Sequence, residues 1–259
     1  MRLATFNILH GRSLVDGRVN LGRYATAMAT LGADVVALQE VDLDQARSHG
    51  ADLTAVAAEA LGTNEHRFVA TLSGAPELWT AATGDLQPAT SHYGIALLSR
   101  YPVSAWRTLK LPALPGRVPL LFPGRRRPVM VGDEPRAALA ATVELPDGPV
   151  TIVSTHLTFI PGWNAVQLRR LVRALRDSAR PALLMGDLNL HGNRPADVTG
   201  WTSLGAAATY PVASPRRQLD HVLADGFRGA GGRVRAVEAV DLGLSDHRAL
   251  VVDVDLLGA

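Results

Sequence analysis

Polar side chains follow several short apolar segments, and their types are those that bind a cation and activate water. Asn7 follows the apolar start of the chain, Glu40 follows a second such segment, and Asp187 and Asn189 follow a third. Carboxylate and amide oxygens are the ligands that hard divalent cations prefer. If the ends of these segments converge on one rim, the sequence predicts a cavity lined by carboxylates and amides.

Two histidines and two further aspartates continue this pattern. His156 ends another apolar segment, Asp220 lies inside a late one, and Asp246 and His247 precede the last one. Each residue alone has an ordinary explanation, as a turn residue, a solvated carboxylate or a hydrogen-bonded core histidine. Six such sites together favour a catalytic cleft, although spacing by itself does not identify the chemistry.

Short apolar runs bounded by Gly, Pro, Asp or Asn predict the elements that position these residues. Strands are expected over residues 3–9, 34–39, 67–72, 94–99, 138–144, 150–155, 182–185, 218–223, 233–239 and 249–254. Helices are expected over 21–31, 51–61 and 164–180. Hairpin-like neighbours mix with strand–helix–strand units, which favours two mixed sheets packed face to face with helices outside. We expect an α/β fold in a single domain spanning residues 1–259.

Composition excludes several classes of protein. The chain has 259 residues, of which 47% are hydrophobic, so it can bury a core and is not disordered as a whole. No apolar run approaches the roughly 20 residues that cross a bilayer, and polar residues interrupt the N-terminus before a signal peptide could form. There is no cysteine, and the net charge of +2 is too small for a bulk polyanion binder. We expect a cytoplasmic monomer without a transmembrane segment.

Six motifs in order resemble those of the endonuclease/exonuclease/phosphatase superfamily, whose fold is deoxyribonuclease-I-like. They are Thr5-Phe6-Asn7, Leu38-Gln39-Glu40-Val41, Ser154-Thr155-His156-Leu157, Gly186-Asp187-Leu188-Asn189, Leu219-Asp220-His221-Val222 and Leu244-Ser245-Asp246-His247-Arg248. The resemblance implies a four-layer α/β/β/α sandwich, in agreement with the two mixed sheets expected above. It also implies hydrolysis of a phosphate ester with a divalent cation, usually Mg²⁺, with Mn²⁺ as a possible substitute.

The resemblance implies a metal-binding group. Glu40 matches the principal ligand, and Asn7 matches a neighbouring amide that binds the metal or contacts the phosphate. Asp246 matches a residue that contacts the metal directly or through water.

A second group matches the catalytic residues of the family. Asp187 matches the residue that polarises or deprotonates the attacking water, and Asn189 one that donates a hydrogen bond to the phosphoryl oxygen. His247 with its partner Asp220 matches the other side of the phosphate, where His247 serves as a base or as a charged stabiliser. His156 matches a second histidine that contacts the phosphate or protonates the leaving oxygen.

Two residues match the family less closely. Tyr93 opens a strand at a position where relatives place a phosphate neighbour, and rim packing is its alternative role. Arg136 lies where relatives carry Pro-Arg, and its guanidinium could brace a phosphate or Glu40. Relatives often have a basic residue two positions before the equivalent of Asp220, whereas this chain has Gln218 there.

The substrate depends on the rim loops, above all residues 118–130, which include Leu120, Leu121, Phe122 and Arg125–Arg127. These arginines could hold backbone phosphates, or the apolar residues could enter a lipid surface, or the segment could be an ordinary hairpin. We favour nucleic acid as the substrate over a phospholipid, a sphingolipid or an inositol phosphate. A binding module that kept the fold without turnover is the remaining alternative, and it predicts loss of a catalytic residue that this chain retains.

Overall fold

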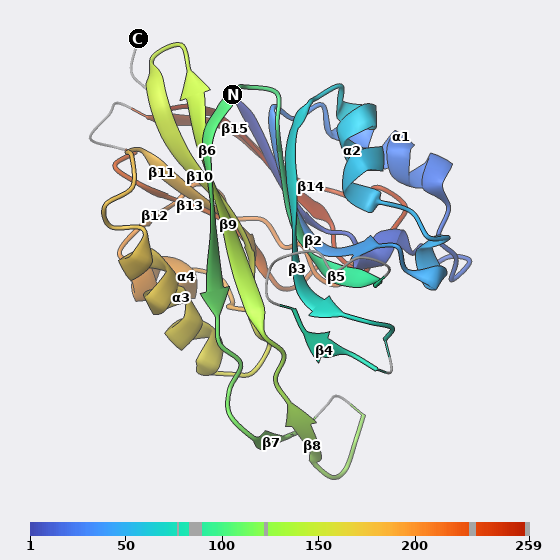
Figure 1. Ribbon diagram of the computed structural model, residues 1–259. Coiled ribbons are helices and arrows are strands. Elements are labelled where there is room, and N and C mark those ends of the chain that lie inside the picture. The colour runs from blue at the N-terminus through green and yellow to red at the C-terminus, as the bar shows by residue number, and fades with distance from the viewer. Residues whose placement is uncertain (77, 83–89, 122–123, 228–231, 257–259) are drawn as a thin grey trace.

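The computed structural model describes residues 1–76, 78–82, 90–121, 124–227 and 232–256. Two large mixed sheets pack face to face, and helices cover their outer faces (Figure 1). The α/β/β/α sandwich expected from the sequence is therefore confirmed.

The first sheet has seven strands in the order β14-β15-β1-β2-β5-β3-β4. Their bounds are β1 (Arg2–Asn7), β2 (Val35–Leu43), β3 (Glu65–Ser73), β4 (Thr80–Ala81), β5 (His92–Ser99), β14 (Arg233–Val240) and β15 (Ala249–Asp255). Only the β1–β2 pair is parallel among the pairings of the described residues. Helices α1 (Leu21–Leu31) and α2 (Leu53–Leu61) cover its outer face.

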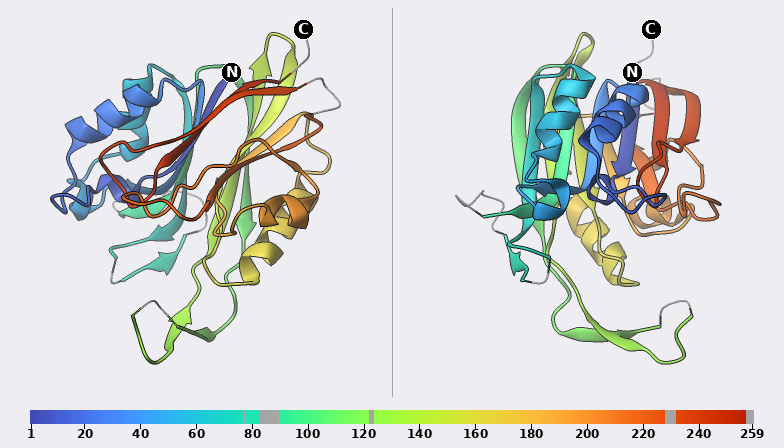
Figure 2. Two further views of the ribbon diagram at one scale, coloured as in Figure 1. Left: turned by 180° about the vertical axis from the view of Figure 1, so that it is seen from behind. Right: turned by 90° about the vertical axis from the view of Figure 1, so that its right-hand side faces the viewer.

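The second sheet has six strands in the order β12-β13-β11-β10-β9-β6. Their bounds are β6 (Val103–Leu111), β9 (Arg136–Leu145), β10 (Gly148–His156), β11 (Ala182–Asp187), β12 (Thr202–Ser203) and β13 (Asp220–Asp225). Helices α3 (Trp163–Ala174) and α4 (Arg194–Thr199) lie on its outer face (Figure 1). A hairpin of β7 (Arg117–Leu120) and β8 (Val129–Gly132) leaves this sheet between β6 and β9 and projects from the body (Figure 2).

Alternation along the strands produces the layers. Every second residue faces the core between the sheets, as Leu183 and Met185 do on β11, while Ala182 and Leu184 pack under α3. Both faces of the central strands are thus buried, which explains why their sequences read as continuous apolar runs.

Helix ends follow from local chemistry. Asn20 accepts a hydrogen bond from the backbone of Arg23 at the start of α1, and Asp52 accepts two at the start of α2. The predicted helix over 164–180 is too long, because α3 ends at Ala174. Past that point Arg180 Nη1 donates to the carbonyl oxygens of Leu175 and Ser178, which replaces further helical hydrogen bonds.

Several strand predictions need correction. The prediction that the second strand ends at Gln39-Glu40 is wrong, because β2 continues to Leu43 through a bulge between Gln39 and Val41. Asp220 starts β13 and does not interrupt it. Strand β6 and helix α4 were not predicted, and the segment 112–135 contains the β7–β8 hairpin. Phe122 lies outside the described residues.

The strand registers bring residues of both sheets to one rim of the sandwich. On the second sheet, Leu111 pairs with Arg136, His156 with Asp187, and Asp187 with Asp220. On the first sheet, Asn7 pairs with Gln39, and Val41 pairs with Gly94 beside Tyr93. No helix among the described residues is both long and apolar enough to cross a bilayer.

Candidate active site

The residues of the site extend the core-facing series of their strands. On β1, Leu3 faces the core between the sheets, so Thr5 and Asn7 face the same side. On β11, Leu183 and Met185 are followed in the same way by Asp187. The same alternation continues from Ile152 to His156 on β10 and from Val222 back to Asp220 on β13. The apolar core thus ends in a layer of polar side chains at the rim.

Glu40 reaches this layer through a backbone irregularity. Val36 and Leu38 face the helices, and simple alternation would send Glu40 to that side as well. The bulge inserts Glu40 as an extra residue, with φ of 58°, so that Val41 takes the helix-facing position. This left-handed conformation is uncommon for a residue other than glycine and is typical of functional sites.

Asn7 links the two sheets. Its Nδ2 donates to Oε1 of Glu40 at 3.0 Å and to Oδ2 of Asp187 at 3.1 Å. Its Oδ1 accepts from the backbone N–H of Leu9 at 3.2 Å, which fixes the orientation of the amide. Glu40 on the first sheet and Asp187 on the second are therefore brought together by one side chain.

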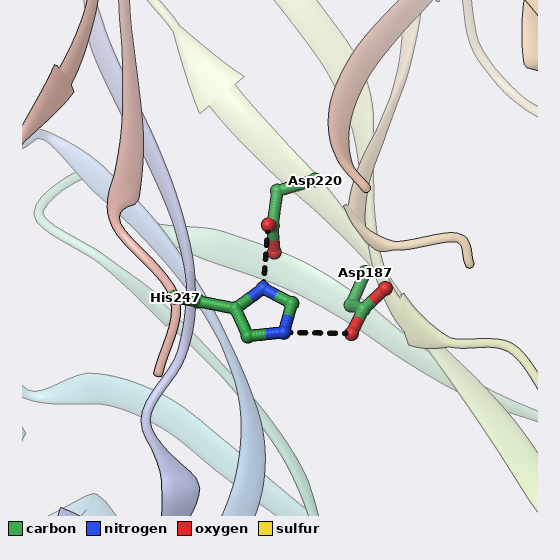
Figure 3. A group of neighbouring side chains, drawn as sticks. All are labelled: Asp187, Asp220 and His247. Atoms are coloured by element: carbon green, nitrogen blue, oxygen red, sulfur yellow. Dashed lines mark hydrogen bonds and ion pairs between the residues drawn. The ribbon is translucent and has the colours of Figure 1, made fainter. Parts of the chain in front are cut away.

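His247 lies between two carboxylates (Figure 3). Its Nδ1 is 2.8 Å from Oδ2 of Asp220, and its Nε2 is 3.8 Å from Oδ2 of Asp187. Burial alone would lower the pKa of His247, but attraction to Asp220, its hydrogen bond and the charge of Asp187 raise this pKa to about 10. The imidazole is thus a cation at neutral pH.

Asp187 is buried, with 2% of its surface exposed. Burial and repulsion by Asp220 raise the pKa of Asp187 to about 7, against the opposing effects of His247 and the hydrogen bond from Asn7. The backbone N–H of Asn189 donates to Oδ1 of Asp187 at 3.0 Å. Gly186 precedes it because a Cβ there would lie 1.9 Å from the carbonyl oxygen of Thr155.

His156 differs from His247 in charge. Its Nδ1 is 3.3 Å from Nη1 of Arg136, and a guanidinium only donates, so Nδ1 is the acceptor and Nε2 carries the proton. That Nε2 is 3.5 Å from Oδ2 of Asp187 and 3.5 Å from Nδ2 of Asn189. Burial, Arg136 and His247 lower the pKa of His156 well below its usual value, so this ring is neutral.

Asp246, Tyr93 and Arg136 complete the predicted set at this rim. Asp246 is partly exposed, and its charge contributes to raising the pKa of Glu40, after the larger effect of burial. Tyr93 and Glu40 line a pocket of about 220 Å³. Arg136 lies beside His156 and pairs with Glu134 at 3.4 Å, and its Nε is buried without a hydrogen-bond partner among the described residues. All ten predicted residues therefore gather in one region.

Sequence reasoning missed two sets of residues. Ser245, with φ of 69°, donates from Oγ to the carbonyl oxygen of Asn7 at 2.6 Å and accepts from the backbone N–H of His247 at 3.1 Å. Arg47 and Trp79 also line the pocket of Glu40, and the Arg47 guanidinium lies 5.4 Å from the ring centre of Tyr93. Ser245 was inside a recognised motif, whereas nothing in the sequence near Arg47 signals the site.

The oxygen-rich side of the rim fits a divalent cation. Burial raises the pKa of Glu40 most, and the charge of Asp246 raises it further, against the hydrogen bond from Asn7 and the charges of Arg136 and His247. A cation beside this buried carboxylate would compensate the cost of its burial. Asp246 adds a second carboxylate on the same side. The ligand atoms of Asp187, Asp220 and His247 also lie within 4.8 Å of one another. However, both nitrogens of the His247 imidazolium carry protons, so it has no lone pair for a metal. Among these residues, Glu40 and Asp246 could hold a metal through carboxylate oxygens alone.

Comparison with solved structures supports this description of the fold. An endonuclease/exonuclease/phosphatase from Beutenbergia cavernae is 24% identical, with a TM-score of 0.68 over 100% of this chain and 72% of that chain. A mannosyl-6-phosphatase of Bacteroides thetaiotaomicron is 16% identical, with a TM-score of 0.63 over 98% and 99%. Sphingomyelinase C from Streptomyces griseocarneus is 17% identical, with a TM-score of 0.61 over 97% and 98%.

No protein of curated function matches the sequence. The sequence model of the Endonuclease/Exonuclease/phosphatase family matches residues 4–247, which contain every candidate site residue. The chain belongs to the endonuclease/exonuclease/phosphatase family and is a metal-dependent hydrolase of phosphoric esters.

Proposed function

We propose that this chain cleaves phosphodiester bonds of nucleic acid with a Mg²⁺ ion and an activated water. The observation that carries the hydrolytic chemistry is the junction at Asn7, whose Nδ2 hydrogen-bonds Glu40 on one sheet and Asp187 on the other. The carboxylate that would bind the metal and the carboxylate that would activate the water therefore lie on two sides of Asn7 Nδ2, as hydrolysis of one phosphoryl group requires.

Glu40 and Asp246 would hold the Mg²⁺ ion. Mg²⁺ retains several waters and needs few carboxylates, so two suffice. When bound, the ion neutralises charge on the phosphoryl oxygens and supports the leaving oxygen. Asn7 presents its NH₂ group to both carboxylates, which favours a role in orienting them over direct metal ligation.

Asp187 is the better general base of the two candidates. A base must be able to accept a proton at the working pH, and a pKa of about 7 allows this for Asp187. His247 has a pKa raised to about 10 and already holds its proton. We assign His247 to stabilising negative charge on the phosphoryl oxygens, with Asp220 fixing its ring.

The neutral His156 and Asn189 serve as hydrogen-bond donors to the substrate. His156 Nε2 lies 3.5 Å from Oδ2 of Asp187, and Asn189 Nδ2 lies 3.5 Å from that nitrogen and donates one of its two N–H groups to the carbonyl oxygen of Leu157. Arg136 supplies a fixed positive charge behind His156, and Tyr93 forms the wall of the adjoining pocket. These groups are already in place for a developing dianionic phosphorane-like transition state.

Nucleic acid is supported by the charge around the site. Arg47 lines the pocket of Glu40, and a cavity that shares Arg47 with this pocket is lined by two more arginines. Several arginines in adjoining pockets can bind successive phosphates of a nucleic-acid backbone.

A substrate panel tests the proposal. Bis-p-nitrophenyl phosphate, supercoiled plasmid, a single-stranded oligonucleotide and sphingomyelin vesicles are incubated with Mg²⁺, and in parallel with excess chelator. We expect chelator-sensitive nicking of plasmid or cleavage of the oligonucleotide, and loss of both in Asp187→Asn. Release only from vesicles would refute the preference for nucleic acid, and no release from any phosphoester would refute catalysis itself.

The β7–β8 hairpin favours a phospholipid as the second candidate substrate. It projects from the rim that carries the site (Figure 2). Leu121, which directly follows β7, is 66% exposed and Met130 on β8 is 52% exposed, and Arg125–Arg127 lie between them in the sequence. Exposed apolar side chains beside arginines are typical of surfaces that enter an anionic membrane interface. If this candidate is correct, Leu121→Asp lowers vesicle hydrolysis and leaves bis-p-nitrophenyl phosphate turnover unchanged.

A further inference from the structure

A cationic cavity adjoins the candidate active site. It has a volume of about 550 Å³, and five of its lining residues are basic, namely Arg12, Arg18, Arg47, His10 and His49. None of its described lining residues is acidic, and Glu77, which follows Pro76 of the lining, lies outside the described residues. A cavity of this composition fits an anion.

Two carboxylates near the lining residues already have ion-pair partners, of which Arg47 is itself a lining residue. Asp16 pairs with Arg23 at 2.6 Å, and Asp42 accepts two hydrogen bonds from Arg47. The side chains of Arg12 and Arg18 are exposed and have no ion pair with a described residue. Two full positive charges are therefore free to bind a ligand.

The loop that carries these arginines is closed by its own backbone. Arg12 and Val19 form an isolated antiparallel bridge, and the N–H of Ser13 donates to the carbonyl oxygen of Arg18 at 3.0 Å. Both arginines therefore stem from the two sides of one short hairpin, which limits the entropy lost when they bind a ligand.

Arg47 and His10 connect the cavity to the reacting groups. Both line this cavity and also the pocket of about 220 Å³ that contains Glu40 and Tyr93. Asp42 fixes the Arg47 guanidinium through Nε and Nη2, and its Nη1 has no hydrogen bond to a described residue. Burial, and after it the charges of Arg47 and Arg12, lower the pKa of His10 to about 4, so this ring is neutral at pH 7 and the positive charge at this junction is carried by the arginines.

We propose that this cavity is a subsite for a second anionic group of the substrate, a phosphate next to the one that is hydrolysed. The inference rests on the proposed function, because it names a feature of the substrate that the same site cleaves. Arg12 and Arg18 bind the second phosphate from the loop side, and Arg47 binds it from the side of the reacting centre. Substrates with two neighbouring phosphates are then preferred over those with one.

Dinucleotides test the subsite. Thymidine dinucleotide with one internal phosphate is compared with the forms that carry an additional 5′- or 3′-phosphate, in Mg²⁺, by kcat/KM. We expect at least one phosphorylated form to be preferred by about tenfold or more, the factor gained from one charge-assisted hydrogen bond. The double variant Arg12→Ala/Arg18→Ala should bring this ratio close to one.

Arg176→Ala is the matched control, because this arginine lies on the far segment after α3 and is 80% exposed. It removes a positive charge and should keep the ratio of the unmodified protein. Equal rates on all three dinucleotides, or a ratio that survives in the double variant, would overturn the subsite. So would a double variant that loses only hydrolysis of anionic vesicles, since the arginines would then serve a membrane surface.

Binding of inorganic phosphate separates failure of the subsite from failure of the proposed function. Phosphate is titrated against Asp187→Asn in chelator, with and without the Arg12→Ala/Arg18→Ala pair, and followed by ³¹P NMR. Binding that depends on the two arginines supports the subsite even if no phosphoester is cleaved. If the dinucleotides are hydrolysed but phosphate binding is unchanged by the Arg12→Ala/Arg18→Ala pair, the proposed function stands and the subsite is refuted.

Discussion

Replacing Asp187 by Asn should make the protein more stable at pH 8 while it removes turnover. Burial and Asp220 raise the pKa of Asp187 from its usual 3.8 to about 7. Each unit of pKa difference corresponds to about 1.4 kcal/mol, so ionising this carboxyl group in the folded state costs about 4 kcal/mol. The neutral amide of the variant does not carry this cost. Because the variant also lacks the general base, its kcat should be lower by at least about 10²-fold.

The sign of the pH dependence follows from the two pKa values. Between pH 3.8 and about 7 the folded state holds a proton on Asp187 that the unfolded state has released. The stability of the unmodified protein therefore falls as the pH rises through this window, relative to that of the variant. At pH 4 the two proteins should differ little, and at pH 8 the variant should be more stable by about 4 kcal/mol.

Urea unfolding in the presence of chelator measures this difference, with the slopes compared to confirm that the same surface is exposed. Asp177→Asn is the control, because Asp177 is a highly exposed carboxylate whose pairing with Arg176 is solvated. A stability difference between Asp187→Asn and the unmodified protein that is the same at pH 4 and pH 8 would refute the reasoning, because Asp187 would then not be a strained, buried base.

Three further predictions concern single residues. Glu40→Gln should raise the Mg²⁺ concentration for half-maximal hydrolysis of bis-p-nitrophenyl phosphate by at least about tenfold, the effect of losing one charged ligand contact. The control Glu59→Gln, on the exposed face of α2, should leave this concentration unchanged. An unchanged Mg²⁺ requirement in Glu40→Gln would contradict the ligand assignment. The rate of hydrolysis should rise as Asp187 loses its proton near pH 7 and fall as His247 loses its proton near pH 10. Asp220→Asn should move the fall to lower pH, because Asp220 raises the pKa of His247. A fall at the same pH in this variant would show that Asp220 does not set the charge of His247. Ser245→Ala should lower the free energy of unfolding by about 1–2 kcal/mol, because two buried hydrogen bonds are lost. Since these bonds position Asn7 and His247, kcat should fall more than KM changes. Equal effects on kcat and on KM would contradict a positioning role.

Alternation made the central part of the site predictable. Apolar residues at every second position of β11 and β10 lead directly to Asp187 and His156, so the pattern that builds the core also aims these side chains. The motifs around these residues then supplied their expected chemistry. The position of Asp220 at the start of β13 follows from its pairing with Asp187, which no local pattern contains.

Glu40 and Arg47 show where the sequence is insufficient. A one-residue bulge leaves no compositional mark, so the strand was expected to end at the residue that in fact lies in its middle. Arg47 reaches the site because a bidentate pair with the buried Asp42 turns it toward Tyr93. Such tertiary pairs form only after the sheet has formed, and the local sequence looks like an ordinary polar loop.

Strand β6 was missed for a related reason. It is an edge strand, and polar residues such as Ser104 and Arg107 occupy its exposed positions. The sequence therefore lacks the continuous apolar run by which the central strands were recognised.

The central claim is that groups from two separate sheets act on one phosphoryl centre. A double-mutant cycle between Glu40→Gln and Asp187→Asn tests it most directly, with kcat/KM for bis-p-nitrophenyl phosphate measured at saturating Mg²⁺. Because Asn7 hydrogen-bonds both carboxylates, we expect the double variant to lose much less than the product of the two single losses. Losses that simply multiply would contradict the claim, since Glu40 and Asp187 would then act independently.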